Sequence, residues 1–189
     1  MTVAGDVADP ATTERLVTAA VVRFGRIDTL VNNAGIFVSK PFNKYSFDDY
    51  ARVASVNVVG FFHVTQRVID VMLAQGNGGH IVNITTTLVE QALAAVPSAL
   101  TALTKGALAA VTKSLAMEYA RHGIRVNAIS PGVIDTSMHN GAAAAYAGMH
   151  PQNRIGDVAD VVHGALYLET APFVTGETLH IDGGQSAGH

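Results

Sequence analysis

Short apolar runs alternate with longer amphipathic stretches along this chain, and each pattern predicts a different element. Four runs rich in Val and Ile are bounded by Gly, Asn or Pro, as buried β-strands commonly are. They lie near 27–32, 80–85, 124–130 and 177–182. A shorter run at the start, "MTVAGDV", is a further candidate strand.

Between these runs, apolar residues recur at helical spacing. The spacing predicts helices over 8–25, 46–76, 98–122 and 157–169. Ser46 is of the residue type that caps a helix N-terminus, and Gly25 and Gly76 are placed to end helices.

Strands that alternate with helices predict βαβ units, in which helices cover both faces of a parallel sheet. We therefore expect one α/β domain over residues 1–189, with no linker or internal repeat. Ligands of such sheets bind at the carboxyl ends of the strands. This rule places the candidate functional residues at Asn32–Gly35, Thr85–Thr87 and Ser130–Thr136.

The composition excludes several kinds of site and partner. The formal net charge is −3 and Lys and Arg are not clustered, which argues against nucleic acid as a main partner. The chain has no Cys, and its eight His follow no metal-ligand spacing, so we expect no metal site. No run of apolar residues is long enough to span a membrane, so we expect a cytoplasmic protein with no membrane segment.

Six short motifs follow one another along the chain. They are "LVNNAG" at 30–35, "SVNVVG" at 55–60, "HIVNIT" at 80–85, "LTKGALAAVTKSLA" at 103–116, "GIRVNAISPG" at 123–132 and "VTGETLHIDGG" at 174–184. In this order they resemble the short-chain dehydrogenases/reductases, and most of all the 3-oxoacyl carrier-protein reductase type. The resemblance covers nearly the whole chain and implies a Rossmann-like parallel sheet.

The same resemblance implies a function and its partners. The cofactor would be NAD or NADP, and hydride would pass between it and a small-molecule carbonyl or alcohol. A homo-oligomer is also implied, because the family pairs through the helices that are here at 46–75 and 98–121 and through the last strand. The family's substrate loop corresponds to about 137–155, where no residue pattern indicates a particular substrate.

The residues that would meet the cofactor are carried over from the family motifs. They are Asp6, Val7, Asn33, Ala34, Gly35, Lys105, Pro131, Gly132, Ile134 and Thr136. Asp6 and Val7 resemble the pair at the adenine, Asn33–Gly35 the segment beside the adenine ribose, and the residues from Pro131 onward the strip at the nicotinamide amide. Other interpretations remain open: Asp6 or Asp9 could cap the following helix, and Pro131–Gly132 could be a simple turn.

The resemblance also implies the catalytic residues. The family uses Ser, Tyr and Lys, the last two spaced Y-x-x-x-K so that both lie on one helix face. The lysine lowers the pKa of the phenol and binds the nicotinamide ribose, the phenol donates a proton, and the serine holds the carbonyl oxygen. In this chain Lys105 matches the lysine, Thr101 stands at the tyrosine position and Thr86 at the serine position. Asn57 matches an asparagine that holds a proton-relay water in a distorted helix; alone, it would be read as a surface residue.

Two departures from the family pattern put activity in doubt. An aliphatic hydroxyl is far less acidic than a phenol of pKa ~10, so Lys105 cannot make Thr101 an equivalent acid. Tyr146, in the loop before the last helix, is a weak alternative source of the proton. The T-G-x-x-x-G-x-G motif, which cradles the cofactor pyrophosphate, occurs nowhere in the 189 residues.

The second departure also affects the sheet. We expect the family's first two βα units to be missing from this sequence, because its opening segment around Val3–Val7 corresponds by resemblance to the family's third strand. Strand 27–32 would then be an exposed edge. The chain is thus either an impaired NAD(P)-dependent oxidoreductase or a non-catalytic relative that binds a ligand or a partner subunit.

Overall fold

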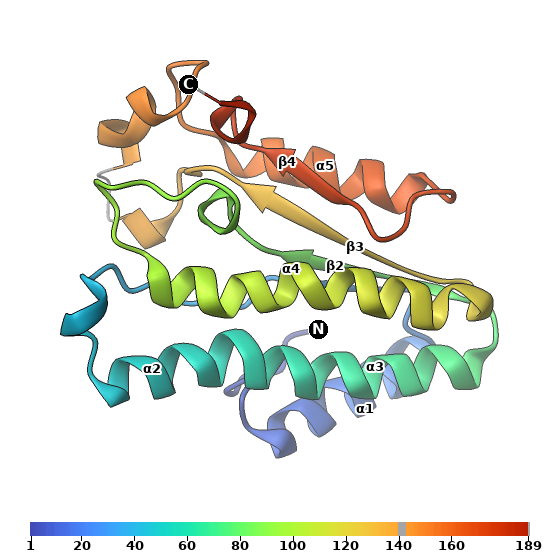
Figure 1. The fold of residues 1–189 in the computed structure, drawn as a ribbon. Helices are drawn as coiled ribbons and strands as arrows, with labels where there is room; N and C mark the ends of the chain where they lie inside the picture. The colour runs from blue at the N-terminus through green and yellow to red at the C-terminus, as the bar shows by residue number, and fades with distance from the viewer. Residues whose placement is uncertain (140–142, 189) are drawn as a thin grey trace.

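The computed structural model describes residues 1–139 and 143–188 and contains one parallel sheet of four strands in the order β1-β2-β3-β4 (Figure 1). The strands are β1 (Thr29–Asn32), β2 (Gly79–Ile84), β3 (Ile124–Pro131) and β4 (Thr178–Ile181). Every neighbouring pair is parallel, with Ile81 opposite Val126 at the centre. The four predicted strands and the Rossmann-like α/β class are therefore confirmed.

The first helix, α1 (Pro10–Phe24), begins and ends at residues suited to those positions. The Asp9 carboxylate accepts hydrogen bonds from two backbone N–H groups of the first turn, at 3.1 and 3.2 Å. Gly25 ends the helix with a φ of 78°, a left-handed conformation that glycine adopts without steric penalty.

The predicted helix over 46–76 is continuous but distorted in its middle. It consists of α2 (Phe47–Ala54), a π-helical turn (Ser55–Gly60) and α3 (Phe61–Gln75). Ser46 caps it as expected, accepting a hydrogen bond from Asp49 N at 3.1 Å. By length and composition alone, this continuous helix is long and apolar enough to cross a membrane; in the fold its inward side chains pack in the protein core.

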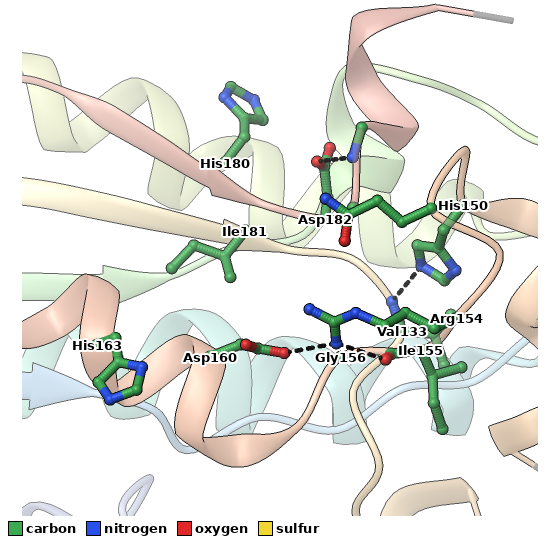
Figure 2. Close-up of a pocket in the computed structure, with 13 residues that line it drawn as sticks. Val133, His150, Arg154, Ile155, Gly156, Asp160, His163, His180, Ile181 and Asp182 are labelled. Carbon is green, nitrogen blue, oxygen red and sulfur yellow. Dashed lines mark hydrogen bonds and ion pairs between the residues drawn. The ribbon is translucent and has the colours of Figure 1, made fainter.

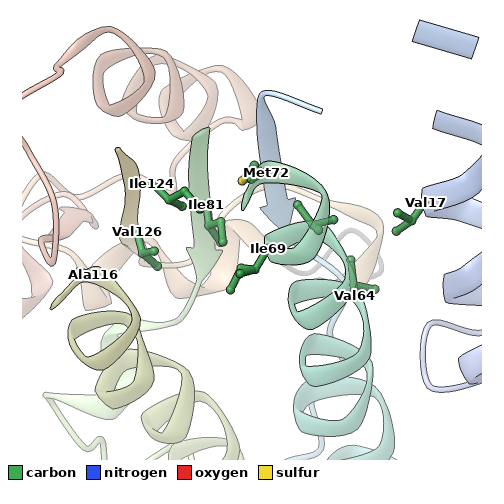
Figure 3. Packing of buried hydrophobic residues seen from close by; sticks show 9 residues of the cluster. Val17, Val64, Ile69, Met72, Ile81, Ala116, Ile124 and Val126 are labelled. Carbon is green, nitrogen blue, oxygen red and sulfur yellow. The ribbon is translucent and has the colours of Figure 1, made fainter. Parts of the chain in front are cut away.

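Two apolar layers hold the helices to the sheet. On one face α3 and α4 (Ala99–Tyr119) pack against the strands around Ile81 and Val126, and Val17 of α1 extends this layer beside α3 (Figure 3). On the other face α5 (Val158–Thr170) places Leu168 against Val82 and Ile129. Alternate residues of β2 thus enter opposite cores, which explains why the central strands are apolar throughout.

The prediction of a strand at "MTVAGDV" is wrong, because residues 1–7 have no strand conformation. A strand needs a hydrogen-bonded neighbour, and none of the described strands pairs with this segment. The segment packs on the long helix instead: a Cβ added at Gly60 would lie 2.7 Å from Val7 Cγ2. At the sheet edge, β2 is the one described strand that pairs with β1, and Val31 of β1 is 48% exposed.

Candidate active site

The carboxyl ends of β1, β2 and β3 open into a cavity of about 500 Å³, here called the main cleft. The cleft is lined by segments that follow these strands, by Thr101 and Lys105 of α4, and by the start of α5. Residues from all three predicted loop positions take part, including Asn33, Thr86 and Thr136. The rule that ligands of parallel sheets bind at strand ends therefore locates the cleft correctly.

Lys105 is the charged side chain of this cleft. Its ammonium donates a hydrogen bond to the Ile84 carbonyl oxygen at 2.7 Å, and only 8% of the residue is exposed. None of the ion pairs formed by the described residues includes Lys105. Burial therefore acts without compensation and lowers the pKa of Lys105 from 10.5 to about 8.

Thr101 lies one helical turn before Lys105 and also lines the cleft. The residue is 5% exposed, and its hydroxyl oxygen has no hydrogen-bonding partner within the described part of the chain. Thr86 stands at the end of β2, half-buried, and its hydroxyl accepts a hydrogen bond from Leu88 N at 3.3 Å. Lys105, Thr101 and Thr86 therefore bring one ammonium group and two threonine hydroxyls to the cleft. Tyr146 also lines the cleft, but no phenol stands at the position four residues before the lysine.

Asn57 lies behind the cleft rather than in its described lining. It sits in the π-helical turn and is 1% exposed, so its interpretation as a surface residue is wrong. Its side chain accepts from Ile36 N at 2.9 Å and donates to Ile36 O at 3.1 Å and to Thr104 Oγ1 at 3.1 Å. The π-helical turn thus orients the Asn57 side-chain amide so that it joins the loop after β1 to α4 through hydrogen bonds.

This loop approaches Lys105 closely at Gly35. A Cβ added there would lie 3.0 Å from Lys105 Nζ and 3.4 Å from Asn57 Oδ1. Glycine at this position therefore lets the backbone pass beside the buried ammonium, as the resemblance implied for a segment that approaches a ligand.

The strip after β3 is fixed from outside the cleft by His150. Pro131, Gly132, Ile134 and Thr136 line the cleft as predicted. His150, 3% exposed, accepts a hydrogen bond from Val133 N at 3.0 Å, and a Cβ at Gly132 would lie 2.7 Å from the same imidazole nitrogen. Neither the strip's need for glycine nor the role of His150 could be read from the sequence, because both depend on a loop that is distant along the chain.

A second cavity, of about 390 Å³, lies beside the strip (Figure 2). Its charged groups already have partners within the fold. Arg154 pairs with Asp160 at 2.9 Å, and Asp182 accepts from Gly184 N at 2.9 Å. This cavity therefore offers no unpaired charge among the described residues, and the main cleft is the stronger candidate site.

Three of the predicted cofactor residues do not line the main cleft within the described structure: Asp6, Val7 and Ala34. Asp6 accepts a hydrogen bond from Ala8 N at 2.9 Å, whereas Asp9 is the helix cap. Conversely, no sequence pattern identified most of the apolar lining. That lining includes Phe37, Leu88, Val96, Met149, Val158 and Val161.

Comparison with known proteins decides the family. The model of a family described as enoyl-(acyl carrier protein) reductase matches residues 1–186. A 3β-hydroxysteroid dehydrogenase from Eggerthella lenta is 36% identical over 192 residues, which cover 97% of this chain and 73% of that protein. The crystal structure of a short-chain type dehydrogenase/reductase from Mycobacterium marinum superposes with a TM-score of 0.94 at 28% identity, covering all of this chain and 76% of the other.

The chain belongs to the short-chain dehydrogenase/reductase family. The chain is also similar to a 3-ketoacyl-(acyl-carrier-protein) reductase from Brucella melitensis, whose crystal structure was solved in complex with NADH. It has a TM-score of 0.91 at 31% identity, over 97% of this chain and 77% of that one. The relatives are longer than this chain, and their matched parts contain the four-stranded sheet described above.

The residues present fit one half of a nicotinamide dinucleotide. Gly35 leaves room beside the unpaired Lys105 ammonium, and the Pro131–Thr136 strip faces the same cleft. For the pyrophosphate half, the 189 residues contain no T-G-x-x-x-G-x-G motif.

Proposed function

We propose that this chain is an NAD(P)-dependent oxidoreductase that acts on a carbonyl or alcohol substrate. The observation that carries the proposal is that Lys105, Thr101 and Thr86 line one cleft together with Gly35 and the strip after β3. The family assignment supports it, as does the NADH named for the Brucella melitensis relative.

In this proposal a bound nicotinamide cofactor supplies or accepts the hydride, and the chain's own residues position it and handle the proton. Asn33, Gly35 and the strip residues Pro131, Gly132, Ile134 and Thr136 hold the cofactor, with Asp6, Val7 and Ala34 at its adenosine end. Lys105 binds the ribose beside the nicotinamide. Thr86 holds the substrate oxygen through its hydroxyl.

Proton transfer is the weak step of this site. General acid catalysis by a positioned side chain contributes ~10²–10⁴ to a rate. Thr101 has a hydroxyl where the family has a phenol, and an aliphatic hydroxyl does not ionise in the range where Lys105 could tune it. We therefore propose that turnover is slow. We also propose that Asn57 fixes the loop after β1 against α4 and does not contact the substrate.

A non-catalytic role is the second candidate, because one observation favours it. The Thr101 hydroxyl is buried and unpartnered, yet it cannot replace a phenol as an acid. A family member that binds a ligand or a partner subunit without turning it over would show this pattern.

Magnetisation-transfer NMR with NADH and NADPH tests the cofactor assignment. We expect weak binding, with the nicotinamide and ribose protons receiving more magnetisation from the protein than the adenine protons, because the fitting residues surround the nicotinamide end. The signal should fall in Lys105→Met and persist in Lys113→Met, an exposed lysine of the same helix. Contact through the adenine alone, unaffected by Lys105→Met, would contradict the proposal.

Placing a tyrosine at position 101 distinguishes an impaired enzyme from a non-catalytic relative. In Thr101→Tyr, NADH-dependent reduction of a small ketone should rise by about 10²–10⁴-fold, as expected for a general acid. Thr101→Phe supplies the ring without the hydroxyl and should give no gain. If Thr101→Tyr folds, binds NADH and still reduces nothing, the non-catalytic role is supported instead.

We also propose that the protein works in the cytoplasm as a homo-oligomer. Exposed apolar side chains on the long helix, on α4 and on α5, such as Phe62, Leu103 and Leu166, support self-association through these elements. Light scattering of the purified chain measures the oligomeric state, and a monomer at all concentrations would contradict this part of the proposal.

A further inference from the structure

The main cleft has an unusual balance of charge and apolar surface. Lys105 is the only formally charged residue in its described lining, which contains no Asp or Glu. The ammonium has three hydrogens and uses one on the Ile84 carbonyl, so donor capacity remains for a ligand. A buried cation without a counter-charge is unfavourable in the empty protein, and an anionic ligand would relieve that penalty.

Thr101 provides a second, independent sign of a ligand. Its hydroxyl is buried, lines the same cleft and has no partner among the described residues. Buried polar groups in folded proteins are nearly always hydrogen-bonded, so an unpartnered one in a cleft wall indicates a group that the ligand supplies. Residues at i and i+4 share a helix face, with Cβ atoms roughly 5–6 Å apart. Both side chains therefore line the cleft from the same helix face, and a carboxylate has one oxygen to offer to each donor.

Beside its polar groups, the cleft offers a continuous set of apolar side chains to a ligand. Phe37, Leu88, Val96, Met149, Val158 and Val161 line it. Its volume of about 500 Å³ lies within the ~300–1,000 Å³ usual for small-molecule sites. An alkyl or aryl chain would be desolvated favourably against these side chains, whereas a cationic ligand would be repelled by the Lys105 ammonium.

We propose that the main cleft binds monocarboxylates with an apolar tail, one carboxylate oxygen accepting from the Lys105 ammonium and the other from the Thr101 hydroxyl. The proposal rests on the proposed function for its choice of ligand cleft, but it needs neither cofactor nor turnover. It specifies the ligand class of a site in which threonine replaces the bulkier tyrosine, and it applies equally to an oxidoreductase and to a non-catalytic binder.

Calorimetric titration with octanoate and with octanamide, which has the same chain length but no charge, tests this inference. We expect the unmodified chain to bind octanoate at least about tenfold more tightly than octanamide, as one charge-assisted hydrogen bond would give. The preference should disappear in Lys105→Met and in Lys105→Gln, and Lys113→Met, exposed on the same helix, should retain it. Thr101→Val should lose part of the preference and Thr101→Ser should recover it, because serine keeps the hydroxyl.

Circular dichroism of each variant shows whether the fold is kept. If only one of the two Lys105 variants folds, that variant alone is enough to test the role of the charge. Equal affinity for octanoate and octanamide, no binding of either, or a preference that survives loss of the Lys105 charge would overturn the inference. NADH-dependent ketone reduction is measured on the same samples. Carboxylate preference without reduction would defeat the proposed oxidoreductase function alone, and reduction without the preference would defeat this inference alone.

Discussion

Lys105 shows how a buried side chain in a candidate site can lower the stability of the fold that holds it. Its ammonium is buried against the Ile84 carbonyl with no acidic partner among the described residues, and burial brings its pKa down to about 8. At neutral pH Lys105 is protonated in both states, but its lower pKa means that protonation is less favourable in the folded protein than in the unfolded chain. The charged lysine therefore lowers the free energy of unfolding. Such strain at a site is expected where ligand binding compensates for it.

Removing this charge should stabilise the protein at pH 7. The fall in pKa from 10.5 to about 8 corresponds to a few kcal/mol, and loss of the Ile84 hydrogen bond offsets about 1 kcal/mol of it. We expect Lys105→Met to raise the free energy of unfolding by about 1–3 kcal/mol in urea titrations. Lys113→Met, at an exposed position, should change it by less than about 0.5 kcal/mol.

The stability difference between the unmodified chain and Lys105→Met should depend on pH. Between about pH 8 and pH 10.5 the unfolded chain binds more protons at this lysine than the folded one, so stability from this group rises with pH. The advantage of Lys105→Met should therefore shrink over this range and vanish above it. An advantage that is constant with pH would mean that packing, not charge, distinguishes the two proteins.

At the scale of single elements, two glycines in helical segments have opposite roles. Gly106 lies in α4, where an added Cβ would meet only Val89 Cγ1 at the ordinary contact distance of 3.7 Å. Gly60 ends the π-helical turn, where a Cβ would lie 2.7 Å from Val7 Cγ2 and 3.4 Å from its backbone carbon. The first glycine only weakens its helix, whereas the second makes room for the N-terminal segment.

Alanine at each position separates these roles. Gly106→Ala should stabilise the protein by about 0.5–1 kcal/mol through helix propensity. Gly60→Ala should destabilise it by about 1–3 kcal/mol, because the rigid Val7 side chain must move. Thermal unfolding measures both changes. The double variant Val7→Ala/Gly60→Ala should recover part of the loss, and no recovery would show that Val7 is not the obstacle.

At the scale of the whole molecule, the sheet has an unprotected edge at β1. This strand pairs on one side only, and its Val31 is half exposed. Unpaired strand edges with exposed apolar residues tend to associate with other chains unless charge or a covering element prevents it.

A lysine on this edge should reduce association of the isolated chain. We expect Val31→Lys to lower the fraction of large species in light scattering at high protein concentration, with little change in unfolding temperature because the position is exposed. Val22→Lys, on the exposed surface of α1, is the matched control. Equal effects of the two lysines would indicate a general gain in solubility rather than protection of the edge.

The sequence by itself determined the elements and the position of the cleft. Val- and Ile-rich runs, helical periodicity and the end signals at Ser46, Gly25 and Gly76 identified four strands and the main helices, because these signals act between residues close together in the chain. The strand-end rule indicated that Asn33, Thr86 and Thr136 would share one edge of the sheet. The order of the motifs indicated the family, and that resemblance singled out Thr101 and Lys105 on the helix.

Only the tertiary structure decided which of these residues meet and what surrounds them. Residues 1–7 have a strand-like composition but no strand, because pairing depends on a neighbour that is distant in sequence. The buried Asn57 side chain is hydrogen-bonded to Ile36, 21 positions away. His150 is hydrogen-bonded to the strip after β3 at Val133, 17 positions away. Burial and hydrogen bonding across such separations are set by packing, and local sequence does not encode them.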